Sequence, residues 1–435
     1  MSAPTIILGG GVTGLAAGIA SGCPVYEAEP APGGICSSYY VRPGSTERLI
    51  SAPADGEAYR FEIGGGHWIF GGDPTILKFI RSLTPVKSYG RLSSVYFPDC
   101  KLYVPYPLQN HLRVLGPEIA TKALAEMANP QGQVRTMQDW LLRSFGPTLC
   151  DLFFVPFHEL YTAGLYKQIA PQDDYKSPVS LPLALKGAFE AAQAVGYNTQ
   201  YLYPEEGLNT LAKRMGERCD LRYGKRVVKI DATGKAVHFA DGSSQGYAQL
   251  LCTLPLNKAV ELSGVKVEST PDPHSSVLVL NLGAVRGPAC PPDHWLYHQA
   301  TQSGFHRVGF YSNVDRSFLP KGAREKGDRV SIYVERAYVG GQRPSDAEQQ
   351  AYGQAVVKEL QAWGYIGAAE VVDPTWIDVA YTWQRPGSKW RAQAMAALEA
   401  QSIYPVGRYA RWTFQGIADS IRDGFYAGSA LKDPR

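Results

Sequence analysis

Apolar runs near the start of the chain predict a strand, a helix and a second strand in close succession. Residues 5–8 form a short apolar run typical of a buried strand, and residues 15–21 favour a helix. Residues 24–27 form a second short run that ends in Glu27. This order of elements is typical of an α/β fold.

The remaining apolar periodicity separates helical segments from strand segments. Amphipathic helices are predicted at residues 116–127, 137–145, 181–194, 347–363 and 390–399, and a last helix is predicted to start near Asp419 and Ser420. Strands are predicted at residues 221–230, 236–240, 250–254, 277–282, 308–311 and 329–335. Helices therefore dominate one internal stretch of the chain, and strands dominate another.

A glycine motif joins the first strand to the first helix. Gly9, Gly11 and Gly14, with Thr13 between the last two, match G-x-G-x-x-G. The first glycine of this motif permits a tight turn, the second lets the backbone approach a pyrophosphate, and the third lets the helix pack on the strand. The N–H groups at the helix start bind phosphate, and Glu27 stands about where an acid meets a ribose hydroxyl. Placed between two strands, the motif predicts a dinucleotide site rather than a plain glycine-rich turn.

A second glycine pair distinguishes between dinucleotides. Glu27 and Ala28, followed by Gly33 and Gly34, give the segment EAEPAPGG. The segment resembles the E-A-x4-G-G extension of FAD-dependent amine oxidases, protoporphyrinogen oxidases and UDP-galactopyranose mutases. That resemblance implies FAD, whose extended second half passes close to these glycines. Alone, the segment would fit a proline-glycine loop equally well.

Other segments resemble the flavin-dependent UDP-galactopyranose mutases, particularly the eukaryotic type, over nearly the whole chain. Residues 62–70 (EIGGGHWIF) are similar to the G-G-H-x-I-F loop of that family. This resemblance implies that Gly65, Gly66 and His67 lie against the flavin, with His67 beside N5; an isolated histidine of this kind would more often be a core residue. The last helix, opened by Asp419 and Ser420, would then direct its positive end at the flavin pyrimidine.

Residues 104–110 (VPYPLQN) resemble the V-P-Y-P-F-Q-N segment of the mutases. There the two aromatic side chains enclose the uracil and the glutamine hydrogen-bonds to its edge. The resemblance implies that Tyr106, Leu108 and Gln109 contact the base. Because Leu108 replaces the phenylalanine, the identity of the base stays open.

Two further segments resemble the diphosphate-binding part of the family. Tyr297 and Arg307 lie in a W-L-Y…F-Y-R-like run, and Arg408 lies in GRYARW, which is similar to G-R-F-G-x-W. Arginine suits such a role because its planar guanidinium is permanently charged and binds phosphate through two donors. Tyr381 and Asn198 are further implied substrate contacts.

Taken together, the resemblance implies an FAD-dependent nucleotide-sugar mutase, an isomerase that interconverts the pyranose and furanose forms of a UDP-galactose-like NDP-hexose. Reduced FAD would be the active form, with NAD(P)H or an equivalent as its reductant. Its N5 would attack the anomeric carbon, while Arg307 and Arg408 stabilise the departing diphosphate and His67 tunes N5. The alternatives are a net-redox FAD enzyme resembling amine oxidases, protoporphyrinogen oxidases or desaturases, and a non-catalytic FAD-binding protein.

The implied architecture is an α/β fold whose discontinuous Rossmann-like FAD-binding domain carries two insertions. We expect residues 1–90, 196–264 and 385–435 to form the FAD-binding domain. Residues 111–195 would form a helical domain, and residues 91–110 with 265–384 a mixed or antiparallel sheet domain that holds the substrate.

The composition indicates which partners, metal sites and cellular compartment to expect. The 43 Lys+Arg residues nearly balance 40 Asp+Glu residues, so the charge gives no field for nucleic acid. The seven cysteines stand singly, which predicts neither a zinc site nor a redox dithiol and favours a reducing compartment. No apolar run approaches the ~18 residues of a membrane span. We therefore expect a cytoplasmic flavoprotein without a metal, whose oligomeric state the sequence leaves open.

Overall fold

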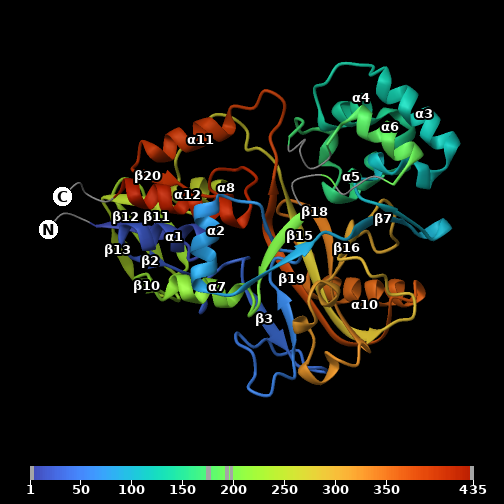
Figure 1. The fold of residues 1–435 in the computed structure, drawn as a ribbon. Helices are drawn as coiled ribbons and strands as arrows, with labels where there is room; N and C mark the ends of the chain where they lie inside the picture. The colour runs from blue at the N-terminus through green and yellow to red at the C-terminus, as the bar shows by residue number, and fades with distance from the viewer. Residues whose placement is uncertain (1–3, 173–177, 192–194, 196–198, 432–435) are drawn as a thin grey trace.

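A parallel sheet carries the nucleotide motif in the computed structural model, which describes residues 4–172, 178–191, 195 and 199–431. The order of this five-stranded sheet is β10-β2-β1-β14-β20, and all neighbouring strands are parallel. Its strands are β1 (Thr5–Leu8), β2 (Val25–Tyr26), β10 (Leu221–Arg222), β14 (Gln249–Cys252) and β20 (Ile403–Pro405). Because the strands come from the start, middle and end of the chain, this half of the molecule is discontinuous in sequence (Figure 1).

The helices of this half pack closely around the sheet. They are α1 (Val12–Ser21), α2 (Pro74–Leu83), α7 (Leu208–Gly216), α8 (Leu256–Ser263), α11 (Trp390–Glu399) and α12 (Ile417–Ala430). A Cβ atom at Gly424 would lie 2.1 Å from the Thr13 carbonyl oxygen, so α12 rests directly on the backbone of α1.

The last helix starts at Ile417, earlier in the chain than the predicted Asp419. Asp419 lies in its first turn, where the carboxylate accepts a hydrogen bond from the Gly416 N–H at 3.3 Å. Asp419, which was expected to be the first residue of the helix, instead lies in its first turn and accepts a hydrogen bond from the N-cap residue.

A large sheet lies beside the parallel sheet. Its strand order is β19-β15-β18-β17-β16-β7-β8, antiparallel except for the parallel pair β16 and β7. The strands are β7 (Ser93–Phe97), β8 (Leu102–Pro105), β15 (His274–Arg286), β16 (Trp295–His298), β17 (Arg307–Phe310), β18 (Arg329–Val339) and β19 (Ile366–Thr382). Leu278 and Leu280 of β15 pack under α10 (Asp346–Ala362), whereas Val277 and Val279 face the core shared with the parallel-sheet half. This alternation predicts two covered faces, and Figure 1 shows α10 along one of them.

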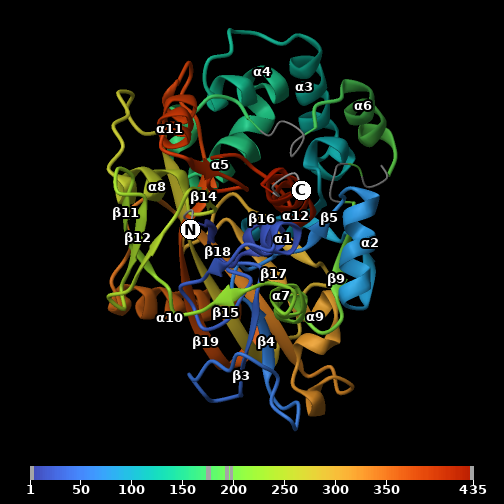
Figure 2. The ribbon, with the colours of Figure 1, turned by 90° about the vertical axis from the view of Figure 1, so that its left-hand side faces the viewer.

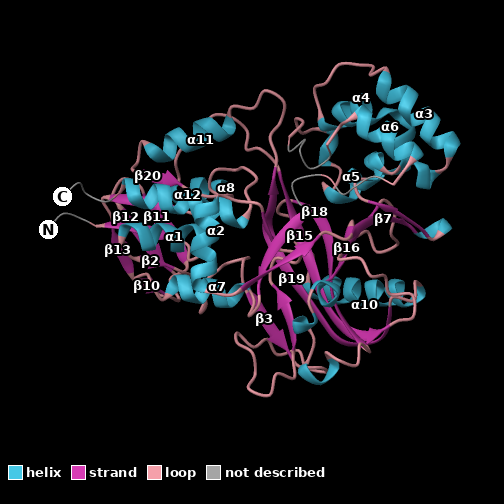
Figure 3. Ribbon diagram, viewed as in Figure 1, coloured by secondary structure: helices cyan, strands magenta, loops and turns pink. Residues whose placement is uncertain are grey.

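A group of helices packs beside β7 and β8 of the large sheet and shares a hydrophobic core with them (Figure 3). It contains α3 (Pro117–Ala128), α4 (Met137–Leu149), a π-helical turn (Cys150–Phe154), α5 (Val155–Tyr161) and α6 (Leu181–Phe189). Helix α6 ends before the predicted residue 194 because Glu190 has extended backbone angles, φ −134° and ψ 171°. The predicted fold class, an α/β fold with a helical and a sheet insertion, is confirmed, while the exact domain boundaries remain a proposal.

Three smaller sheets complete the fold, and the one formed by β11, β12 and β13 lies beside α8 of the parallel-sheet half (Figure 2). They are the hairpin β3 (Ser38–Val41) and β4 (Tyr59–Glu62), the sheet β5 (Ile69–Phe70), β9 (Gln200–Pro204) and β6 (Val86–Gly90), and the sheet β11 (Val227–Asp231), β12 (Ala236–Phe239) and β13 (Ser244–Gly246). Within the described ranges, no helix is long and apolar enough to cross a membrane.

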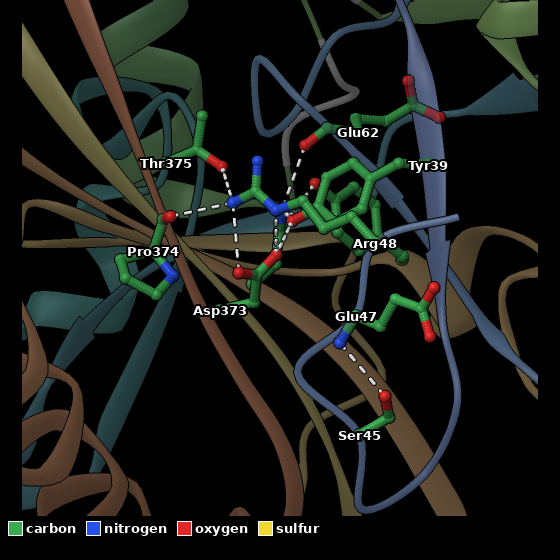
Figure 4. A network of polar contacts seen from close by, with 10 residues as sticks. Tyr39, Ser45, Glu47, Arg48, Glu62, Asp373, Pro374 and Thr375 are labelled. Carbon is green, nitrogen blue, oxygen red and sulfur yellow. Dashed lines mark hydrogen bonds and ion pairs between the residues drawn. The ribbon is translucent and has the colours of Figure 1, made fainter. Parts of the chain in front are cut away.

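A polar network fastens the β3–β4 hairpin to the large sheet (Figure 4). The Arg48 guanidinium donates from Nε to Asp373 Oδ2 at 2.8 Å, and Tyr39 donates to the same oxygen at 2.5 Å. Asn281 of β15 donates from Nδ2 to Tyr39 at 2.9 Å and to the Glu62 carbonyl at 3.0 Å. The network therefore fixes the end of β4, from which the predicted Gly64–His67 loop emerges.

Candidate active site

A cavity lies where the parallel sheet, the large sheet and the helical group meet. Most of the sequence-predicted site residues line it, although they come from widely separated segments. These residues are Gly9, Gly11, Thr13, Glu27, Gly33, Gly34, Gly66, His67, Tyr106, Tyr297, Arg307, Tyr381, Arg408 and Ser420.

The turn between β1 and α1 forms one end of the cavity. Gly11 precedes α1 in an extended conformation, and no side chain among the described residues caps the helix. A Cβ atom at Gly14 would lie 1.9 Å from the Gly9 carbonyl oxygen, which places Gly14 in the packing of the turn and not on the cavity wall. An uncapped helix start beside a cavity fits the phosphates of a dinucleotide.

Glu27, which directly follows β2, lines the same end of the cavity. Its carboxylate accepts hydrogen bonds from the Gly10 N–H at 2.6 Å and from the Glu29 N–H at 2.8 Å. Burial raises the pKa of Glu27. The Gly33 N–H donates to the Gly10 carbonyl at 2.8 Å, so the second glycine pair is tied to the first motif. Ala28 lies outside the cavity wall, since only its neighbour Glu27 reaches the cavity.

The glycine-rich loop after β4 carries His67 into the same cavity. Its Nδ1 donates to the Gly64 carbonyl at 2.8 Å, which fixes the tautomer with an unprotonated Nε2. Burial, reinforced by the charge of Arg408, lowers the pKa of His67 to about 4, so the imidazole is neutral at pH 7. Gly65 packs behind the wall, where an added Cβ atom would lie 2.8 Å from Glu335 Oε1.

Arg307 reaches the cavity from the first position of β17 and is held by a buried carboxylate. Its Nε donates to Glu335 Oε2 at 3.0 Å and its Nη2 donates to Glu335 Oε1 at 2.6 Å. Arg307 outweighs the burial of Glu335 and lowers the pKa of this carboxyl to about 2. His306 Nε2 lies 3.6 Å from the same carboxylate. Glu335 could not be recognised from the sequence, because a lone acid in a strand carries no motif.

Arg408 reaches the cavity from the segment after β20. Its Nη1 donates to the Gln415 carbonyl at 3.1 Å, and its Nη2 donates to the Ala380 carbonyl at 3.1 Å. The guanidinium lies 4.5 Å from the centre of the Phe414 ring and 5.9 Å from that of Tyr381. Backbone acceptors and aromatic rings therefore hold a second cation at the cavity, near His67.

Aromatic side chains continue the wall beyond the two arginines. Tyr106 and Tyr297 lie with their ring centres 4.7 Å apart, and the Arg91 guanidinium lies over Tyr106 at 5.3 Å. The two residues that follow the Tyr106–Pro107 pair do not line the cavity, and their assignment as base contacts stays a prediction. Leu108 is buried in the helical core, and buried Gln109 donates from Nε2 to the Pro178 carbonyl at 2.9 Å.

The remaining predicted residues do not reach the cavity or are not described. Asp419 lies in the first turn of α12, pairs with Arg422 at 3.2 Å and does not line the cavity. The start of the helix reaches the cavity wall through Gly416, Ile417 and Ser420. Asn198 lies outside the described residues.

Sequence reasoning missed a wall contributed by the helical group. Met137, Trp140, Phe153, Phe154, Phe157, His158, Tyr161, Thr162, Gln172 and Trp383 line the cavity on this side. The spacing of Phe153, Phe157 and Tyr161 at every fourth position was the available signal, but the same spacing is typical of a helix core.

Comparison with known proteins places this arrangement among flavoproteins. Residues 22–431 match the family model for flavin-containing amine oxidoreductases. The chain is similar to a reduced UDP-galactopyranose mutase structure at 19% identity, with a TM-score of 0.83 and coverage of 99% of this chain and 95% of that one. It is also similar to a CLA-producing fatty acid isomerase from P. acnes (13% identity, TM-score 0.60, 99% of both chains). A putrescine oxidase bound to putrescine matches at 16% identity, with a TM-score of 0.56 over 99% of both chains. At these identities the likeness shows a shared fold.

Proposed function

The chain belongs to the flavin-containing amine oxidoreductase family, and from that premise we propose that it is an FAD-dependent nucleotide-sugar mutase. Its reaction would interconvert the pyranose and furanose forms of an NDP-hexose, as in the UDP-galactopyranose mutases. The observation that carries the proposal is that Arg307 and Arg408 line the same cavity as Gly66 and His67. Two fixed guanidinium groups suit a diphosphate, whereas the substrate of an amine oxidase is itself a cation.

The residues of the cavity fit FAD. The uncapped start of α1 behind Gly11 would hold the diphosphate, and Glu27 would accept from a ribose hydroxyl. Gly66 and His67 line the cavity and would lie against the ring system. When bound and reduced, FAD supplies the nucleophilic nitrogen for the anomeric carbon.

The side chains around the substrate would bind, orient and stabilise. Arg307 and Arg408 hold the diphosphate as it leaves the sugar and returns, and their charge offsets the charge that develops on it. Their positions are fixed in advance by Glu335 and by the two backbone carbonyls, so little reorganisation is needed. Neutral His67 presents Nε2 as an acceptor, and the tyrosines exclude water from the reacting centre.

We expect the purified, FAD-loaded protein to isomerise a nucleotide furanose only after reduction with dithionite. UDP-galactofuranose and related NDP-furanoses are the substrates to test, with product separation by anion-exchange chromatography. Untreated protein, kept oxidised under air, is the control. Turnover by neither form, together with no rise in melting temperature on adding any nucleotide sugar, would reject the mutase proposal.

Arg408→Ala should weaken UDP binding by about 10- to 100-fold, because hydrogen bonds to charged groups contribute ~1.5–3 kcal/mol. The flavin content should stay at the wild-type value, since Arg408 is assigned to the substrate. Isothermal titration calorimetry and the ratio of flavin to protein absorbance measure the two quantities. Arg42→Ala, at an exposed ion pair with Asp55, is the matched control. Loss of flavin from Arg408→Ala would show that Arg408 binds the cofactor and not the substrate.

A net-redox reaction on an apolar substrate is the second candidate, favoured by the aromatic side chains that α4 and α5 place on the cavity wall. An amine or another lipophilic reductant would then bleach the oxidised flavin under anaerobic conditions. Benzylamine is a suitable first probe. Bleaching without any NDP binding would favour this candidate over the mutase.

A further inference from the structure

His306 is a buried histidine on the cavity wall, and the proposed function gives it no role. It directly precedes β17, its backbone N–H donates to the Glu335 carbonyl at 3.0 Å, and the residue is 1% exposed. Although the residue lines the cavity, neither ring nitrogen has a hydrogen-bond partner within the described part of the chain. Buried polar groups are normally paired, so this imidazole indicates a partner that the protein alone does not supply.

The ring of His306 stands beside the carboxylate that holds Arg307. Its Nε2 lies 3.6 Å from Glu335 Oε2, which is too long for a hydrogen bond but close enough for an ion pair once the imidazole carries a proton. Burial lowers the pKa of His306, so the ring is neutral at pH 7. Since Arg307 and Glu335 carry one charge of each sign, the three side chains together carry no net charge.

The groups around His306 favour Glu335 as the partner of a proton on its ring. Among the described residues, the titratable groups that face the ring are Arg307 of β17, Glu335 of β18, His298 of β16 and Tyr161 of α5, which lies against β18 (Figure 1). Glu335 raises the pKa of His306, and Arg307 lowers it. Burial lowers the pKa of His298 to about 3, so His298 adds no positive charge at pH 7.

His67 lines the same cavity but has a different electrostatic environment. After burial, the strongest influence on its pKa is the charge of Arg408, which lowers the pKa further. For His306, the strongest influence after burial is the Glu335 carboxylate, which raises the pKa. Of these two imidazoles, His306 is therefore the better placed to hold a proton.

A diphosphate held by Arg307 would change the charge balance at His306. The negative charge of the ligand would enter the cavity that the His306 ring lines, where few water molecules screen it. An opposite charge nearby favours the protonated form of a histidine. A proton on His306 would thus have two anionic partners, the ligand and Glu335, whereas in the free protein it has only a carboxylate already paired with Arg307.

We infer that His306 takes up a proton from solvent when a nucleoside diphosphate binds, and that the resulting imidazolium, paired with Glu335, is a further cation of the diphosphate site. This inference rests on the proposed function, which supplies the diphosphate. One proton enters with the ligand and leaves with it, and no bond of the ligand is broken. Because the bound state holds more protons than the free state, affinity should rise as the pH falls toward the pKa of His306 in the free protein.

The test is calorimetric titration of the FAD-loaded, oxidised protein with UDP-galactose at pH 6.5 and pH 8.5, in buffers of different ionisation enthalpy. Both phosphates of UDP-galactose are esterified on two sides, so the ligand itself exchanges no proton in this range. We expect uptake of about half a proton or more per ligand at pH 6.5, little uptake at pH 8.5, and a Kd about tenfold higher at pH 8.5. Binding without proton uptake at pH 6.5 overturns the inference and leaves the proposed function intact. If neither UDP-galactose nor UDP binds, the proposed function fails and the inference fails with it.

His306→Gln locates the proton, because glutamine is polar but does not titrate. The variant should bind UDP-galactose without proton uptake, and its Kd should differ by less than about threefold between the two pH values. His238→Gln, the same substitution on β12 away from the cavity, is the matched control and should keep the wild-type uptake. Circular dichroism and flavin content show whether His306→Gln is folded; His306→Asn serves if it is not, and the wild-type proton count tests the inference without any variant. Uptake that persists in His306→Gln, or that is lost only in His67→Gln, contradicts the assignment.

Discussion

Replacing Arg307 by alanine is expected to lower the free energy of unfolding by roughly 3–5 kcal/mol at pH 7. The loss arises because Glu335, whose side chain is 3% exposed, would keep its charge without the partner that now pairs with it through two nitrogens. Urea unfolding of wild type and variant, both flavin-saturated, measures the difference. This structural effect accompanies the expected loss of diphosphate binding.

The loss of stability in Arg307→Ala should become smaller as the pH falls. In the wild type, Arg307 lowers the pKa of Glu335 from 4.5 to about 2. Its pairing therefore stabilises the fold fully above pH 4.5 and progressively less as the pH falls toward 2. Without Arg307, burial raises the pKa of Glu335 above 4.5, so the variant gains stability on acidification. The difference between the two proteins should shrink between pH 7 and pH 5.

A second substitution separates the ion pair from the loss of packing. Arg307→Ala combined with Glu335→Gln removes the buried charge while keeping the shape of the side chain, and it should recover a large part of the lost stability. The double variant should also lose the pH dependence. Equal instability of the single and double variants at both pH values would show that Arg307 acts on the fold through packing alone.

The nucleotide-binding half was predictable because its signals are local. Gly9 has a positive φ of 97° in the turn, and Gly14 leaves room for the Gly9 carbonyl oxygen. The apolar runs on either side fix the strand and the helix. The loop around His67 was also recognisable because its glycines are adjacent in sequence, and the structure places Gly66 and His67 on the cavity wall. In both cases the residues that form the motif lie within a few positions of one another in the sequence.

The substrate side was less predictable because its geometry depends on contacts between distant segments. Glu335 acquires its role only when β18 pairs with β17 and brings it beside Arg307. Gln109 lies in a segment that matches the family motif, but its side chain donates to the Pro178 carbonyl, which is far away in the sequence. The ladder of Phe153, Phe157 and Tyr161 has the periodicity of a buried helix face, and only the tertiary arrangement opens it to a cavity.

Gly11 and Gly14 offer a way to separate cofactor binding from folding. A Cβ atom added at Gly11 meets no described protein atom within 4 Å, and the φ of −68° suits any residue. Gly11→Ala should therefore change the stability of the flavin-free protein by less than about 1 kcal/mol, the scale of an N-cap substitution. The methyl group would instead occupy the space assigned to the pyrophosphate. We expect FAD affinity to fall on the order of 100-fold, because backbone bonds to a charged group contribute ~1.5–3 kcal/mol each.

Gly14→Ala should behave differently, because its Cβ atom would lie 1.9 Å from the Gly9 carbonyl oxygen. Overpacking of this kind costs ~1–3 kcal/mol, so this variant should lose stability even without flavin. FAD titration and urea unfolding of the flavin-free proteins measure both quantities, with Gly246→Ala on β13 as the control, where the nearest contact is 3.8 Å. If Gly11→Ala bound FAD with wild-type affinity, the turn between β1 and α1 would not be part of the cofactor site. Equal destabilisation of Gly11→Ala and Gly14→Ala would instead assign both glycines to the fold, because a glycine reserved for a ligand is one whose methyl group the protein alone can accommodate.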